Sequence, residues 1–174
     1  MKRVAMLMLT LTLVAACADD NPTPAGPSTS GPIVFTAPLS AANEVPPVSN
    51  AEAGGRGSVT VSFNVPRDSQ GAITGPGTAT FAMNLNSFAP GTPAILAHIH
   101  PGPAGVNGPI LVNTNLSVGA PLLLGDGTVN VAITVNISQT DTTNITANPA
   151  AYYFNVHTPL NPGGAVRGQL TRVQ

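Results

Sequence analysis

The chain has 174 residues, of which only 7% are charged, with six basic side chains, seven acidic side chains and a single cysteine. Two of the basic residues stand at positions 2 and 3, which leaves four scattered arginines. Four arginines cannot build the cationic face that a nucleic acid needs, so the composition excludes a nucleic-acid partner. One cysteine also excludes a disulfide within the chain.

Residues 1–16 have the order of parts of a secretory signal: Lys2 and Arg3, an apolar run too short to span a bilayer, and small residues. Cys17 stands where the small residues end. The segment therefore resembles a bacterial lipoprotein signal, which implies that cleavage leaves Cys17 as the lipid-bearing first residue and makes the membrane a partner. An ordinary signal peptide with an incidental cysteine is the alternative. Because Ala18 follows Cys17, the resemblance favours an exported protein at the outer membrane or cell surface over the inner membrane.

Residues 17–32 contain mainly Asp, Asn, Pro, Thr, Gly and Ser, with almost no large apolar side chain. Such a stretch cannot bury enough surface to offset the entropy lost on ordering. We therefore expect a disordered tether over residues 17–32. One ordinary domain follows it over residues 33–174.

The strand patterns begin at residues 33–39 and continue after three Gly-X-Gly phrases. The phrases stand at 55–57, 75–77 and 125–127, and period-2 alternations of apolar residues follow over 59–65, 79–85 and 129–135. This pattern predicts half-buried antiparallel strands that are entered through glycine turns. A phosphate site at these glycines is excluded, because that chemistry needs a helix after the turn.

Further short strands are predicted in the second half of the domain, over residues 94–100, 110–113, 121–124, 152–157 and 166–171. No stretch shows a sustained helical period of apolar residues. The chain has 18 glycines and 18 prolines, which favour turns between strands. The sequence therefore predicts an all-β domain of about eight or nine short strands. We expect an antiparallel β-sandwich or flattened barrel.

The three histidines of the chain are the candidate metal ligands. His98 and His100 share one face of a predicted strand while Ile99 points to the core. The same period-2 alternation along the predicted strand at 152–157 places His157 on the face away from the core. Three imidazoles suit zinc or copper with one position left open. The His-X-His pattern is similar to that of copper-zinc superoxide dismutase, although no second metal site is visible. Alternatively, the histidines hydrogen-bond the loop at residues 101–109 to the final hairpin.

Four motifs together carry a more specific resemblance. They are Asn-Glu-Val-Pro-Pro at 43–47, Ala-His-Ile-His at 97–100, Tyr-Phe-Asn-Val-His at 153–157 and Gly-Gly-Ala-Val-Arg-Gly-Gln at 163–169. In this order they resemble the successive motifs of the CHRD domain, over about residues 33–172. The resemblance implies an immunoglobulin-like β-barrel and, for bacterial members of lipoprotein type, a module without a settled activity.

Glu44 and Arg167 are expected to form a structural ion pair. The family usually has an acidic residue where this chain has Ala165, so the resemblance makes Glu44 the expected partner of Arg167. A bidentate carboxylate–guanidinium contact would tie the first strand to the last. A catalytic Glu44 would need a second titrating group within reach, and the histidines are the only candidates. The absence of a Gly-X-Ser-X-Gly elbow also argues against nucleophilic catalysis, so no catalytic residue is assigned.

These observations favour a non-enzymatic protein: an exported, lipid-anchored CHRD domain that binds a protein, a glycan or a metal ion at the cell envelope. The alternative is a copper or zinc protein that uses His98, His100 and His157 for metal storage or redox chemistry, with superoxide dismutation as its most specific form. Copper and zinc are the only cofactors that the residues indicate.

Overall fold

The computed structural model describes residues 31–174, so the predicted signal, Cys17 and most of the predicted tether lie outside the described part. The described residues form eleven strands, one α-helix and two short 3-10 helices. The predicted all-β class is confirmed. Within this part of the chain, no helix is both long and apolar enough to cross a membrane.

The strands, in chain order, are β1 (Ile33–Ser40), β2 (Arg56–Asn64), β3 (Gly77–Asn86), β4 (Thr92–Ala94), β5 (Leu96–Pro101), β6 (Val112–Asn113), β7 (Leu122–Leu124), β8 (Val129–Ile137), β9 (Tyr152–His157), β10 (Val166–Gln169) and β11 (Thr171–Arg172). The helices are η1 (Ala41–Asn43), α1 (Gln139–Ala147) and η2 (Pro149–Ala151).

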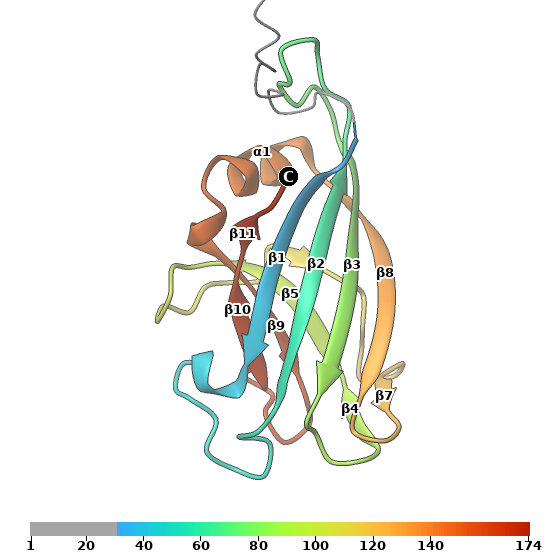
Figure 1. The fold of residues 1–174 in the computed structure, drawn as a ribbon, viewed down its shortest axis with the longest axis vertical. Coiled ribbons are helices and arrows are strands. Elements are labelled where there is room, and N and C mark those ends of the chain that lie inside the picture. Colours follow the sequence, from blue (N-terminus) through green and yellow to red (C-terminus); the bar gives the residue numbers. More distant parts are fainter. Residues whose placement is uncertain (1–30) are drawn as a thin grey trace, which may run out of the picture.

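Nine strands form one antiparallel sheet in the order β6-β5-β9-β10-β1-β2-β3-β8, with β11 also paired to β1. The strands β1, β2, β3 and β8 run side by side across the front of the molecule, and β5, β9 and β10 lie behind them (Figure 1). The sheet curves until it is nearly closed as a barrel. The strands β4 and β7 form a separate two-stranded sheet.

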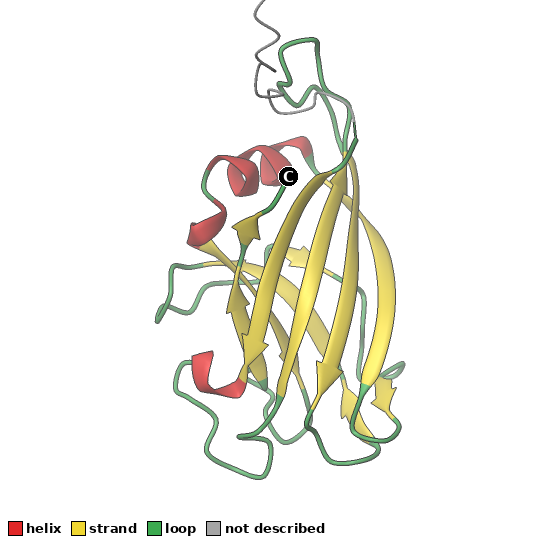
Figure 2. Ribbon diagram, viewed as in Figure 1, coloured by secondary structure: helices red, strands yellow, loops and turns green. Residues whose placement is uncertain are grey.

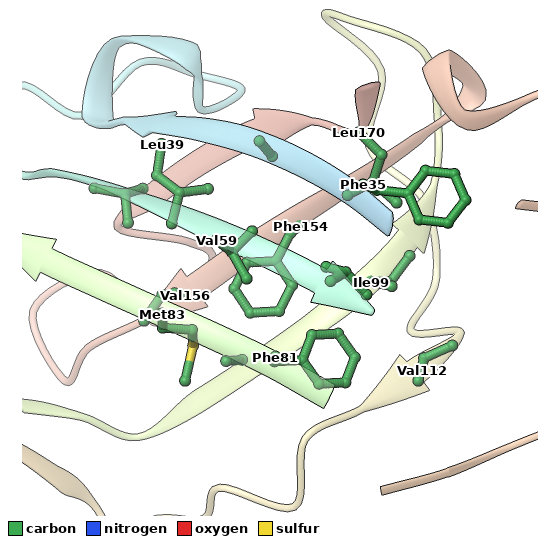
Figure 3. Packing of buried hydrophobic residues seen from close by; sticks show 14 of the residues in the cluster. Phe35, Leu39, Val59, Phe81, Met83, Ile99, Val112, Phe154, Val156 and Leu170 are labelled. Atoms are coloured by element: carbon green, nitrogen blue, oxygen red, sulfur yellow. The ribbon is translucent and has the colours of Figure 1, made fainter. Parts of the chain in front are cut away.

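The core fills the space between the front and back strands. In the register of the sheet, Phe81 of β3 lies opposite Val61 of β2 and Ile133 of β8, so the alternating apolar residues share one face. The ring centroid of Phe81 lies 5.5 Å from that of Phe154 on β9, which joins the two walls (Figure 3). Burying each such side chain contributes about 1.5–3 kcal/mol.

The strand count is higher than predicted because two expected strands are each divided. Residues 94–100 separate into β4 and β5 at Ile95, whose N–H donates to the carbonyl of His157. Residues 166–171 separate into β10 and β11 at Leu170, whose N–H donates to the carbonyl of Tyr152. The chain thus changes its pairing partner from β7 to β9 at Ile95, and beyond Leu170 it still pairs with β1 but no longer with β9.

The helix α1 was not predicted and lies across one end of the barrel (Figure 2). It begins after Ser138, whose hydroxyl accepts a hydrogen bond from the N–H of Asp141 at 3.0 Å. The side chains that α1 buries are those of Thr142 and Ile145. This sparse apolar face is the reason that no helical period stands out in the sequence.

Candidate metal centre

The pairing of β5 with β9 brings the three histidines together. Their register places Leu96 opposite His157, His98 opposite Asn155 and His100 opposite Tyr153. Because alternate residues share a face, all three imidazoles lie on one side of this strand pair. One ring nitrogen of each histidine lies within 4.8 Å of the others.

The face that carries the histidines is buried, although it lies opposite the hydrophobic core. The exposed fractions are 1% for His98, 6% for His100 and 6% for His157. Two nitrogens that share a tetrahedral zinc ion lie about 3.3 Å apart, given Zn–N bonds of about 2.0–2.1 Å. The three nitrogens, within 4.8 Å of one another, would have to move closer together to share one ion.

His157 is oriented by the loop that follows it. Its Nδ1 atom lies 2.9 Å from the carbonyl oxygen of Pro162, so Nδ1 carries the proton and donates. The Nε2 atom of the neutral ring then holds a lone pair, and this buried atom has no hydrogen-bond partner. An imidazole held by Nδ1–H on a backbone carbonyl, with Nε2 free, is the usual arrangement of a metal-ligating histidine.

His100 is held in a similar way by the loop that follows β5. Its Nδ1 atom lies 3.0 Å from the carbonyl oxygen of Gly108 and 2.9 Å from that of Pro109. Two acceptors at one nitrogen require the proton there, so Nε2 again carries the lone pair in the neutral ring. The Nε2 atom lies 3.2 Å from Oδ1 of Asn155.

His98 lies between the other two rings and has no hydrogen-bond partner at either nitrogen. Its centroid is 5.3 Å from that of His100 and 5.0 Å from that of His157. Burial, and then the charges of His157 and His100, lower the pKa of His98 to about 4. Burial is also the main cause that lowers the pKa of His157. Both rings are therefore neutral at pH 7, as metal ligation requires.

Both sequence interpretations of the histidines have support in this geometry. His100 and His157 do anchor the loops that follow them through backbone carbonyls. Anchoring leaves His98 and Nε2 of His157 unexplained, because buried polar atoms normally have partners. Of the four buried side-chain atoms without a partner in residues 31–174, three belong to this cluster.

Arg167 does not form the predicted bidentate contact with Glu44, and the residues described contain no direct ion pair between them. Its guanidinium donates to the side-chain oxygens of Asn107 and Gln169 and to backbone carbonyls of the 103–106 loop. Residues 103–107 supply three of these acceptors and Gln169 of β10 supplies the fourth, in place of the expected partner Glu44. Arg167 is 1% exposed, so a full set of acceptors is needed to offset its desolvation.

Glu44 is buried as well, with an exposed fraction of 5%. The amide nitrogen of Asn155 donates to its Oε1 atom at 3.5 Å. Desolvation raises the pKa of Glu44 to about 7, opposed by the hydrogen bond from Asn155 and the positive charge of Arg167. The two predicted partners therefore interact through charge without direct contact.

Two hollows open on either side of Glu44. One has a volume of about 630 Å³ and also reaches Arg167 and Gln169. The other, of about 340 Å³, reaches Asn107 and Gly164. Glu44 thus lies at the border between solvent-facing grooves and the buried polar face of β9.

Asn155 and Tyr153 are the residues of this site that the sequence did not single out. Both share the phase of His157 along β9, so the period-2 count that placed the histidine also marks them. Tyr153 stacks on His100 with centroids 4.9 Å apart and 8° between the ring planes. Asn155 lies between His100 and Glu44.

Comparison with known proteins agrees with the motifs. The family model of the CHRD domain matches residues 35–170. Searches of curated proteins and of solved structures find no match. The match covers all four motifs, the three histidines, Glu44 and Arg167, and the chain belongs to the CHRD domain family.

Proposed function

We propose that this protein is an exported, lipid-anchored CHRD module of the cell envelope that binds a zinc or copper ion with His98, His100 and His157. The observation that carries the proposal is the cluster itself: one nitrogen from each ring within 4.8 Å, all three rings buried. The unpartnered nitrogens of His98 and His157 supply the reason for a ligand, since a buried lone pair without a partner is costly.

The donor set decides the class of metal. Three neutral imidazoles and no thiolate favour zinc and copper, whereas calcium and magnesium prefer oxygen ligands. Three protein ligands leave a further coordination position for water or another small molecule. The ion would bring a positive charge into a buried site, and the buried carboxylate of Glu44 is linked to His100 through Asn155.

Metal binding or storage fits the geometry better than the alternative of superoxide dismutase-like redox chemistry. The three rings are at most 6% exposed, and the loops that hold His100 and His157 cover them. A redox substrate needs a route to the open coordination position, while a stored or structural ion does not. A protein or glycan ligand at the envelope remains a separate part of the proposal.

The test is metal analysis and calorimetric titration of the purified protein with Zn²⁺ and Cu²⁺. Wild type should bind one equivalent, and each single His→Ala variant should bind at least 100-fold more weakly. The exposed Asp126→Asn variant is the control. Bound metal should also stabilise the fold by about 2.7 kcal/mol when the free metal concentration is 100 times the dissociation constant. The melting temperature should rise accordingly, and a chelator should reverse the rise. Equal metal content in wild type and the histidine variants would refute the site.

The lipid anchor has its own test, because Cys17 lies outside the described residues. Cys17→Ser should move the protein from the membrane fraction to the soluble fraction of the cell envelope, since acylation at this residue supplies the membrane affinity. Membrane association that survives the substitution would refute an acyl anchor at Cys17 and leave the histidine site unaffected.

A further inference from the structure

Asn155 links His100 to Glu44 by its side-chain amide. Its Oδ1 atom lies 3.2 Å from Nε2 of His100, and its Nδ2 atom lies 3.5 Å from Oε1 of Glu44. Asn155 is 2% exposed, and Glu44 is 5% exposed. Water therefore does not set the orientation of this amide, and its two protein neighbours do.

The orientation of the amide decides whether His100 has a free lone pair. Two backbone carbonyls fix the proton of His100 on Nδ1, so Nε2 of the neutral ring is an acceptor. An Asn155 oxygen on that side can only accept, so it pairs with His100 while Nε2 carries a proton and does not block a metal ion once that proton is lost. The reversed amide would place the Nδ2–H₂ group there, hydrogen-bond the lone pair and compete with a metal ion.

Glu44 selects between these two orientations. An ionised carboxylate only accepts hydrogen bonds, so Asn155 turns its Nδ2–H₂ group toward Glu44 and its oxygen toward His100. Gly164 leaves the room that both groups occupy: a Cβ atom added there would lie 2.5 Å from Oε2 of Glu44 and 2.6 Å from Nδ2 of Asn155. A side chain at position 164 would therefore displace Glu44 or Asn155.

We infer that Glu44 and Asn155 are positioning residues of the metal centre, in which Glu44 holds the Asn155 amide so that the Nε2 lone pair of His100 is free to bind the ion. This inference rests on the proposed function. It assigns Glu44 a role that neither a salt bridge to Arg167 nor catalysis supplies.

The first experiment needs no metal. The chain has only three histidines, so the ¹⁵N spectrum contains the signals of three imidazole rings. Each ring is assigned by the single His variant in which its signals disappear. At pH 8, metal-free wild type should show His100 protonated at Nδ1, with Nε2 at the position of a free lone pair. In Glu44→Gln the constraint on the amide is lost, and the Nε2 signal should move upfield as Asn155 donates to it. Identical His100 signals in the two proteins would overturn the inference.

The second experiment measures zinc affinity at pH 8 in wild type, Glu44→Gln, Asn155→Ala and the double variant. Glu44→Gln should bind zinc about 10–100-fold more weakly, the usual effect of losing an outer-shell partner. In the Asn155→Ala background the same substitution should have little further effect, because no amide is left to reorient. An equal loss in both backgrounds would mean that Glu44 acts by charge alone and would overturn the inference. Asp126→Asn again serves as the control.

The two experiments separate the inference from the proposed function. If wild type takes up neither zinc nor copper, the proposed function fails, and the imidazole spectrum still decides whether Glu44 orients the amide. If wild type binds zinc and Glu44→Gln binds it equally well, the metal site stands and the positioning role of Glu44 and Asn155 falls.

Discussion

The guanidinium carbon of Arg167 lies 3.4 Å from the centroid of the Tyr153 ring. His100 stacks on the same ring. Because β9 lies between β5 and β10 in the sheet, the phenol ring separates the permanent positive charge from the imidazole cluster. A cation next to the cluster would oppose a bound metal ion, so this arrangement keeps Arg167 as a structural residue while the histidines remain available.

Arg167→Lys should destabilise the protein by about 2–4 kcal/mol, measured by denaturant unfolding. A lysine ammonium is a point charge and cannot reach the four acceptors that the planar guanidinium contacts, so buried groups lose their partners. Arg56→Lys is the matched control on an exposed arginine and should change stability by less than about 0.5 kcal/mol. Equal stability of the two variants would contradict the structural role.

The period-2 pattern was sufficient to predict which residues face the core. Phe81 and Phe154 are buried as their phases indicate, and His98 lies on the opposite phase. The pairing of β5 with β9 could not be predicted in the same way. It joins segments more than 50 residues apart, and no local turn signal specifies it.

The partners of Arg167 and the role of Asn155 were beyond the sequence for a different reason. Arg167 is satisfied largely by backbone carbonyls at Pro103 and Val106, and every residue type offers such an acceptor. The resemblance pointed to Glu44 instead, because this chain has Ala165 where the family usually has an acidic residue. Asn155 acts through the direction of its amide, which depends on the neighbours that β5 and η1 bring close.

Glu44→Gln should change the pH dependence of stability. The pKa of Glu44 is about 7 in the folded protein against an ordinary value of 4.5, so the folded state binds more protons between these pH values. Wild type therefore loses stability as pH rises from 4.5 to 7 through this group. The variant should be more stable by about 1–3 kcal/mol at pH 8, with the difference vanishing below pH 4.5. A pH-independent difference would contradict the raised pKa.

His98→Leu should make the metal-free protein more stable in acid. The pKa of His98 is lowered to about 4, so below pH 6.5 the unfolded chain binds a proton that the folded protein does not. Wild type therefore loses about 2 kcal/mol through this group on going from pH 8 to pH 5. Leucine removes that loss and the unpartnered nitrogens, and it should also abolish stabilisation by zinc. Thermal unfolding at pH 5 and pH 8, with and without metal, measures both effects.

Gly164→Ala tests the packing that holds Glu44 against Asn155, and the adjacent Gly163→Ala is its matched control. Gly164 has φ = 140°, a conformation that a side chain strains, and its added Cβ atom would collide with both polar groups. Gly163 has no atom within 4 Å of the corresponding position. Gly164→Ala should cost about 1–3 kcal/mol of unfolding free energy and weaken zinc binding, because the displaced carboxylate no longer fixes the amide. Gly163→Ala should leave the zinc affinity unchanged and change stability by less than about 1 kcal/mol. If Gly164→Ala lost stability but kept wild-type zinc affinity, Gly164 would serve the loop alone, and the tight packing around Glu44 would have no part in metal binding.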